Sequence, residues 1–188
     1  MTWPAPVTLR GQHVTLEPLS QDHAADLANA AASLGPLWYT AIPVPDQIPA
    51  EIDRRNSLSD MCAFAQVTPD GQAVGMTTYM HTDQANARVE IGSTWLAPAA
   101  QRGPLNTEAK LLLLTHAFEA LSCIRVEFRT HRLNQQSRRA IERLGAQLEG
   151  ILRNHLIMPD GTLRDTAVYA ILANEWPVIK QHLTAKLA

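Results

Sequence analysis

Apolar residues follow two periods along the chain, and these periods divide it into strands and helices. Strands are expected where apolar and polar residues alternate, or where short apolar runs end in turn residues: 7–9, 13–19, 62–68, 73–81, 88–96, 124–130, 147–158 and 163–172. Helices are expected where apolar residues recur every three or four positions: 21–33, 51–60, 105–121, 135–144 and 175–187. Strands and helices do not alternate strictly, which excludes a plain doubly wound sheet and favours an α+β or mixed α/β domain.

Turn residues support these boundaries. Pro69-Asp70-Gly71 predicts a turn between two strands, and Asp160-Gly161 predicts a hairpin between the last two. Gly145 is placed to end the helix before it. The segment 37–49 carries three prolines together with Trp38 and Tyr39, so we expect an irregular loop that displays aromatic side chains.

Length and composition describe one globular domain. A chain of 188 residues, 46% apolar and 18% charged, suits a single domain over 1–188 with a full hydrophobic core. The formal charge of −2 argues against dedicated nucleic-acid binding. The first residues lack an export signal and the apolar run 111–114 is too short for a bilayer, so we expect a cytoplasmic protein without a membrane partner.

Several familiar catalytic signatures are missing. The sequence has no GxSxG, HExxH or GxGxxG, and the GxxxxG at 145–150 is followed by Ile151 and Leu152 in place of Lys and Ser/Thr. The seven histidines are scattered, and Cys62 and Cys123 are far apart, so neither a metal site nor a disulfide is expected.

The strand 88–96, the loop that follows it and the helix from Asn106 could bind an anion. The first amides of a helix have no partner within it and face the positive end of its dipole. Asn106 or Thr107 can cap this helix. Glu108, in the first turn, would repel a phosphate if it pointed inward, and any buried helix after a strand looks the same.

The run VEIGSTWLAPAAQRGPLNTEAKLLLLTHAFE resembles the fourth strand, pyrophosphate loop and third helix of GNAT N-acetyltransferases, in the branch similar to ribosomal-protein N-terminal acetyltransferases of the RimJ and RimL type. Four further segments agree: LRGQHVTLEPL, LNQQSRRAIERLGA, RNHLIMPDGTLRDTAVYAIL and NEWPVIK. The resemblance covers nearly the whole chain. It implies a mixed, mostly antiparallel sheet of about seven strands flanked by helices, and acetyl transfer from acetyl-CoA to an amine.

The phosphate loop departs from the family pattern Q/R-x-x-G-x-G/A. Gln101 matches, but Pro104 replaces the middle glycine and Asn106 the last one, while Gly103 comes one position early. Proline has no N–H to offer a phosphate. The resemblance therefore implies a reshaped loop, with cofactor contacts from these residues: Thr94, Trp95, Leu96, Gln101, Arg102, Gly103, Leu105, Asn106, Thr107, Asn134 and Ser137.

Two residues are candidates for the chemistry. Glu90 could deprotonate the substrate ammonium directly or through water, and strand alternation places it on one face with Gly92 and Thr94. A solvated or ion-paired glutamate is the other interpretation. By resemblance, Ser137 would lie near the cofactor sulfur, but Ile141 stands where many relatives have a tyrosine acid. The thiolate would then be protonated by Ser137, by water or in solution.

The acceptor is expected to be a small-molecule amine or the α-amino group of a protein. Its binding is assigned to Trp38 and Tyr39 in the loop and to Asn154, His155 and Tyr169 in the hairpin, each of which could equally be a core residue. Two alternatives stay open: another donor such as succinyl-CoA, and a catalytically silent CoA-binding protein. A homodimer formed through strand edges is also considered.

Arginines after the central helix could meet the 3′-phosphate of CoA or RNA, or form a solvated face: Arg125, Arg129, Arg132, Arg138, Arg139, Arg143 and Arg153.

Overall fold

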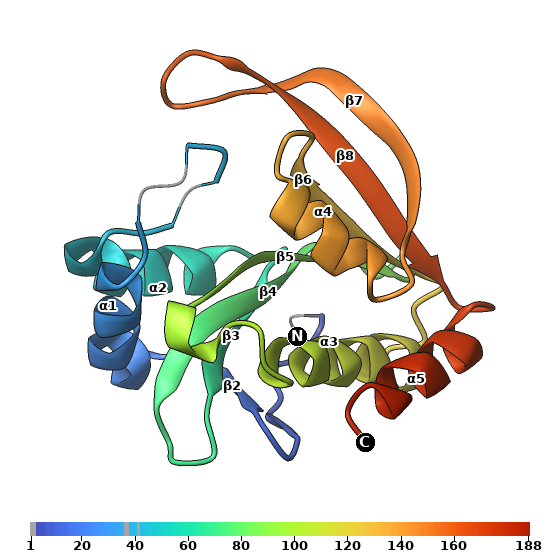
Figure 1. The fold of residues 1–188 in the computed structure, drawn as a ribbon, viewed down its shortest axis with the longest axis horizontal. Helices are drawn as coiled ribbons and strands as arrows, with labels where there is room; N and C mark the ends of the chain where they lie inside the picture. The colour runs from blue at the N-terminus through green and yellow to red at the C-terminus, as the bar shows by residue number, and fades with distance from the viewer. Residues whose placement is uncertain (1–2, 36–37, 41) are drawn as a thin grey trace.

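A single mixed sheet runs through the whole domain. The computed structural model describes residues 3–35, 38–40 and 42–188. Its eight strands lie in the order β1-β2-β3-β4-β5-β6-β8-β7, and every neighbouring pair is antiparallel except β5 and β6 (Figure 1). The mixed, mostly antiparallel sheet expected from the sequence is therefore confirmed, with eight strands in the described chain rather than about seven.

The strands follow the alternating segments closely. Their bounds are β1 Leu9–Arg10, β2 Thr15–Pro18, β3 Cys62–Val67, β4 Ala73–Asp83, β5 Arg88–Leu96, β6 Arg125–His131, β7 Gln147–Ile157 and β8 Leu163–Leu172. Gly71 and Gly161 adopt φ values of 90° and 83°, which glycine reaches at little cost. Both lie in the turns that the sequence predicts, so these two connections are confirmed.

The helices are α1 Ala24–Ala32, α2 Ile48–Ser57, α3 Leu105–Thr115, α4 Gln135–Glu142 and α5 Trp176–Ala185. The second begins three residues earlier than expected, because Pro49 is accommodated in its first turn, where its missing N–H costs nothing. The central helix ends earlier than expected, since 116–120 forms a π-helical turn. Residues 37 and 41 of the predicted aromatic loop 37–49 lie outside the described residues.

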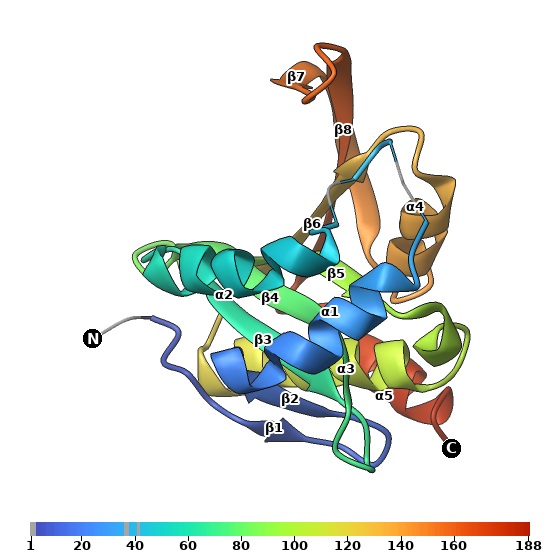
Figure 2. The same ribbon diagram turned by 90° about the vertical axis from the view of Figure 1, so that its left-hand side faces the viewer.

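The helices cover both faces of the sheet. Helices α1 and α2 cover one face over β3 and β4, where Leu27, Ile48 and Ile52 pack on Ala65 and Met76. The opposite face packs against α3, α4 and α5 through a larger apolar cluster. Hairpin β7–β8 extends away from this body (Figure 2). No described helix is long and apolar enough to cross a membrane.

A bulge in β5 changes which residues share a face. Thr78 pairs with Gly92 but Met76 pairs with Trp95, so Ser93, at φ 47°, is an extra residue in the strand. Beyond the bulge, Trp95 belongs to the cluster under α1 and α2, whereas the Thr94 hydroxyl contacts α3. The expectation that Thr94 faces the same side as Glu90 is therefore wrong, because one extra residue reverses the alternation.

Candidate active site

The centre of the sheet opens between its two parallel strands. Strands β5 and β6 pair only through Arg88–Arg125, Val89–Val126 and Glu90–Glu127, after which β6 continues with β8 alone. Beyond Glu90, the main-chain groups on this edge of β5 have no strand partner. The opening thus combines a free strand edge, the bulge at Ser93 and a carboxylate at its narrow end.

Helix α3 begins beside this opening. Pro104 takes the N-cap position with helical φ and ψ, no side chain caps the helix, and the Glu108 N–H donates to the Pro104 carbonyl at 2.9 Å. The amides of Leu105, Asn106 and Thr107 therefore precede the first intrahelical bond. The Asn106 side-chain oxygen is buried without a hydrogen-bond partner. Free amides and positive dipole at one helix end fit an anionic ligand.

The loop before α3 is anchored by Gln101, whose side-chain amide donates to the Leu96 carbonyl at 2.9 Å. Arg102 has a φ of 62° and is exposed, and a Cβ at Gly103 would meet nothing within 4 Å. Gly103 is thus not required by packing. The reshaped loop uses Gln101 to close on β5 and leaves the first turn of α3 open.

Glu108 points away from the helix start. Its carboxylate accepts three backbone N–H groups from the turn between β1 and β2, those of Gln12 at 2.8 Å, His13 at 2.5 Å and Val14 at 2.9 Å. A Cβ at Gly11 would overlap this carboxylate, so the turn needs glycine there. The repulsion of a phosphate considered from the sequence does not arise, because the charge is bound within the N-terminal hairpin.

Lys110 lies buried under the exposed Thr94. Its ammonium donates to the hydroxyls of Thr94 at 2.6 Å and Thr77 at 3.0 Å, and those hydroxyls are 2.8 Å apart. No carboxylate among the described residues lies within ion-pair distance of it. Burial therefore lowers the pKa of Lys110 to about 7. The residue ties α3 to β4 and β5 at the point where the free edge begins.

Glu90 lies at the narrow end of the opening and is only 6% exposed. Its carboxylate is 2.9 Å from Nδ1 of His81, a residue at φ 47° near the end of β4, and 3.4 Å from Nε of Arg129. His81 is largely exposed, so its ring connects the buried carboxylate with solvent. Glu90 is thus a buried carboxylate with an exposed imidazole beside it rather than a solvated surface group.

Glu127 lies on β6 and pairs with Glu90 of β5, and its negative charge offsets the positive charge of the arginines around it. Burial would raise the pKa of Glu127, but hydrogen bonds from Arg125 and Arg129 lower it overall. Arg88 is a third basic neighbour, at 3.8 Å. A cavity of about 50 Å³ lies among His81, Glu90, Glu127 and Arg129. Glu127 is held by two arginines, whereas the nearest partner of Glu90 is the exposed His81 ring.

Helix α4 borders the other side of the opening. The Asn134 side-chain oxygen accepts the Ser137 N–H at 3.0 Å and so caps the helix. Asn134 and Ser137 are half-buried, whereas Ile141 and Leu144 belong to the core. An aliphatic side chain therefore occupies the position where many relatives have a tyrosine acid.

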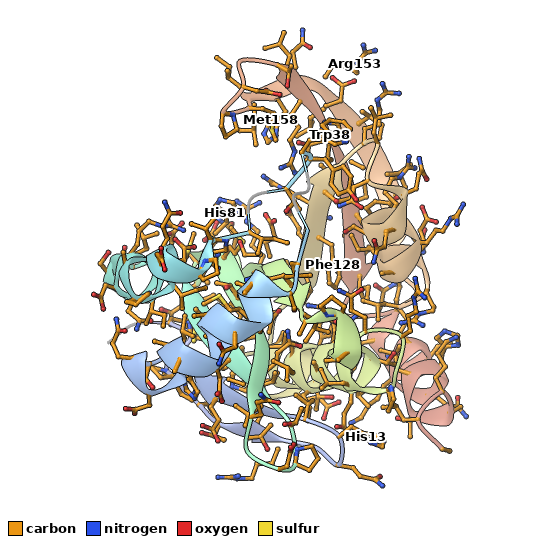
Figure 3. All side chains as sticks on the ribbon, turned by 60° about the vertical axis from the view of Figure 1, so that its left-hand side comes forward. His13, Trp38, His81, Phe128, Arg153 and Met158 are labelled. Atoms are coloured by element: carbon orange, nitrogen blue, oxygen red, sulfur yellow. The ribbon has the colours of Figure 1, made fainter. Side chains whose placement is uncertain are left out.

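The aromatic loop reaches across to β6. The Trp38 ring meets the rings of His131 and Tyr39 edge to face, at centroid distances of 5.1 and 5.3 Å, and 59% of Trp38 stays exposed. Figure 3 shows Trp38 towards β6 and the hairpin, and His81 above the α1–α2 side. His155 Nδ1 lies 3.1 Å from the Thr166 hydroxyl, and Thr166 pairs with His131. Trp38 and His155 thus approach the same end of β6.

Two other predicted acceptor residues are placed differently. The Asn154 N–H donates to Asp165 at 2.9 Å, and its φ of 49° helps bend β7. Tyr169 is fully buried on the opposite face of the sheet, where its hydroxyl accepts from Arg138 and donates to Glu142 of α4, at 2.8 and 2.7 Å. The structure therefore does not bring Tyr169 together with Trp38.

Comparison with known proteins identifies the family. Residues 13–147 match the model of the acetyltransferase (GNAT) domain. This chain belongs to the GNAT family. The match covers the opening, helix α3 and the acidic and basic groups around Glu90, so the family's N-acetyltransferase domain and the site coincide. GNAT enzymes use acetyl-CoA. Among the residues that the structure describes, no three His, Cys, Asp or Glu side chains are grouped so that they could hold a metal ion.

Individual GNAT relatives extend the match. YdaF of Bacillus subtilis, named as a candidate ribosomal N-acetyltransferase, is 36% identical over 125 residues, which are 66% of this chain and 67% of YdaF. A solved GCN5-related N-acetyltransferase from Brucella melitensis is 34% identical with a TM-score of 0.90, over 98% of this chain and 87% of that one. Mycobacterium smegmatis RimJ, solved with CoA-disulfide, is 26% identical with a TM-score of 0.77, over 98% and 95%.

Two residues around the GNAT opening were missed by sequence reasoning. Lys110 stands three and four positions before Leu113 and Leu114, so a helical projection could have placed it on the buried face. His81 directly follows Met80, which pairs with Glu90, but its approach to Glu90 depends on the irregular register at the end of β4. Side-chain contacts across a bulge have no signal in a single sequence.

Proposed function

We propose that this GNAT protein transfers an acetyl group from acetyl-CoA to a primary amine by direct attack in a ternary complex. The observation that carries the proposal is the parting of β5 from β6 directly after Glu90. It gathers a free strand edge, the open first turn of α3 and a buried carboxylate around one opening. These features support donor binding, acceptor activation and charge stabilisation at this opening.

Acetyl-CoA would supply an activated thioester. The amides of Leu105, Asn106 and Thr107 would hold its pyrophosphate, assisted by the helix dipole, and the backbone of Thr94 to Leu96 would hold its pantetheine arm. Lys110 would fix this stretch of β5 through the Thr94 hydroxyl. Pro104 contributes no amide, but its φ of −69° preorganises the helix start.

Glu90 would take the proton of the substrate ammonium, either directly or through the His81 ring at 2.9 Å. The neutral amine attacks the thioester carbonyl, the C–N bond forms and the C–S bond breaks. Backbone N–H groups of the free β5 edge would stabilise the oxyanion. Ile141 cannot donate, so the departing thiolate would receive its proton from Ser137 or from water, and the second proton lost by the attacking nitrogen would restore that donor.

The acceptor would enter on the side of Trp38 and His155. Relatives named for ribosomal proteins support a protein α-amino group, and a small amine is the alternative. Trp38 is suited to contact an extended peptide or a ring, because most of its surface is exposed while His131 supports its edge. Pairing of two subunits through the exposed edge strand β7 stays a prediction.

Calorimetry with acetyl-CoA, succinyl-CoA and free CoA, followed by thiol release across an amine panel, tests the proposal. Micromolar acetyl-CoA binding with amine-dependent thiol release is expected. Absence of binding to all three would overturn every acyltransferase interpretation. Tight binding without thiol release for any amine would favour a silent CoA-binding protein, for which Pro104, Asn106 and Ile141 are the motivating departures.

A further inference from the structure

One guanidinium on the acceptor side of the sheet has no acidic partner among the residues that the structure describes. Arg164, at the start of β8, is half-buried, and its Nε donates to the Thr166 hydroxyl at 3.1 Å. Within the described chain, no carboxylate lies within 4.0 Å of its nitrogens, whereas the neighbouring arginines all have one. Those ion pairs are Arg125 with Glu149, Arg129 with Glu127, and Arg132 and Arg153 with Asp165.

Arg164 faces the reacting centre. Thr166, Val168 and Ala170 alternate on one face of β8 and pair with His131, Arg129 and Glu127 of β6, so Arg164 belongs to the same face as Glu127 and Glu90. The bond to Thr166 directs its side chain along β8 towards that row. Burial lowers the pKa of Arg164, and Glu90 is the charged group that counteracts it. Arg164 in turn helps burial to lower the pKa of His131, the residue against Trp38.

A second donor lies between Arg164 and Glu90. Nε of Arg129 is buried and makes no hydrogen bond, although Glu90 is 3.4 Å away. Donors that stay unpaired in a buried site are costly and are ordinarily satisfied by a ligand or water. Guanidinium groups prefer carboxylates, which they bind through paired N–H groups. The acceptor side therefore offers negative charge at Glu90 for an ammonium and positive charge at Arg164 for an acid.

We propose that Arg164, assisted by Arg129, forms a carboxylate-binding subsite beside Glu90, with Trp38 and His131 as its wall. The carboxylate comes either from the acceptor, as in an N-terminal aspartate or glutamate or a free amino acid, or from the acyl chain of the donor, as in succinyl-CoA. The inference rests on the proposed acyl transfer and specifies its substrate. It gives a physical role to an arginine that folding alone leaves unpaired.

Matched substrates separate the two sources. With acetyl-CoA, acceptors differing only as acid and amide are compared: peptides beginning with Glu or Gln and with Asp or Asn, and free glutamate against glutamine amide. With an acceptor amine that carries no carboxylate, succinyl-CoA is compared with butanoyl-CoA as the acyl donor. The wild-type kcat/KM should favour the acid member of one series about tenfold or more, because a buried charged donor discriminates against a ligand that cannot satisfy it.

Variants then assign the preference to the residue. Arg164→Met should remove the preference for the acid, because kcat/KM for the acidic substrate falls while kcat/KM for the matched neutral substrate changes less than about threefold. Arg164→Lys should keep part of the preference. Arg153→Met, on the same hairpin and largely exposed, should leave it intact. A wild type without acid preference in either series, or equal losses for acid and amide in Arg164→Met, would overturn the subsite.

Equilibrium binding keeps this test separate from the proposed function. Glu- and Gln-terminated peptides are titrated into the protein saturated with CoA, and succinyl-CoA and butanoyl-CoA into the free protein. If no amine is acylated, the proposed transfer has failed, but tighter binding of the acidic ligand that Arg164→Met abolishes still supports the subsite. Equal binding of acid and neutral ligands contradicts it whatever the turnover.

Discussion

The Lys110 ammonium lies 2.6 Å from the Thr94 hydroxyl, so a buried cation without an acid partner supports the strand expected to hold the acyl donor. Taking the charge out of water opposes protonation, and the buried group titrates near neutral pH. The protonation state of Lys110 is therefore linked to the hydrogen bond that positions Thr94 of β5.

Replacing Lys110 by Met should change the pH dependence of stability. The folded pKa is about 7 and the ordinary value 10.5, so between these values the unfolded chain binds more protons and stability rises with pH. The wild-type free energy of unfolding should gain about 1 kcal/mol per pH unit from pH 7.5 to 9 from this residue. Lys110→Met should lose this slope, while exposed Lys186→Met keeps it. Urea unfolding at each pH measures both slopes. An unchanged slope in Lys110→Met would contradict the lowered pKa of Lys110.

Glu90→Gln should reduce kcat by about a hundredfold or more without weakening acetyl-CoA binding, since it removes the proposed base but leaves the β5 backbone intact. His81→Gln separates the two routes for the proton. If the imidazole relays it, His81→Gln should lose activity comparably, and if Glu90 acts directly the loss should be small. Stopped-flow thiol release measures both, with Glu149→Gln as a surface control. Unchanged turnover in Glu90→Gln would remove it from the mechanism.

Tyr169→Phe should destabilise the fold and leave acceptor recognition alone. The hydroxyl joins Arg138 and Glu142 on the face away from Trp38. Loss of two hydrogen bonds to charged groups should cost about 2 kcal/mol. Trp38→Ala, by contrast, should raise the acceptor KM with little effect on stability. Denaturation and steady-state kinetics compare the two, and a raised acceptor KM in Tyr169→Phe would restore Tyr169 to the acceptor site.

Gly11→Ala and Glu108→Gln should weaken the same interaction. A methyl group at position 11 would overlap the Glu108 carboxylate, and Glu108→Gln replaces a charged acceptor of three N–H groups by a neutral one. Each should cost about 1 to 3 kcal/mol of stability. Because Glu108 points away from the helix start, Glu108→Gln should not tighten acetyl-CoA binding. Gly103→Ala is the matched control for Gly11→Ala, because a Cβ at position 103 would contact no other atom within 4 Å.

Local patterns were sufficient for much of this fold. The turns at Gly71 and Gly161, the buried face of α4 at Ile141 and the strand from Arg88 to Leu96 all depend on short-range periodicity and turn chemistry. The mixed, mostly antiparallel pairing also agrees with the family resemblance, although the described chain has eight strands where the resemblance implies about seven.

The side chains at the site depended on geometry that periodicity does not record. One extra residue at Ser93 moved Thr94 to the α3 face, and it thereby created the contact with Lys110. Tyr169 was assigned to the acceptor because it lies in the hairpin, yet β8 is two-sided and its alternation sends Tyr169 towards α4. Arg164 and Arg153 look alike in sequence, but in the structure Arg153 is exposed and pairs with Asp165, whereas Arg164 is half-buried beside Thr166.

The short junction between β5 and β6 has a consequence for the lifetime of the protein. Three residue pairs join five strands on one side to three on the other, so few backbone hydrogen bonds hold the two parts of the sheet together at this point. An acyl donor seated along the open edge would act as a clamp across it, and such a ligand stabilises the folded chain in proportion to the logarithm of its concentration. Resistance to proteolysis should then rise with the concentration of the acyl donor.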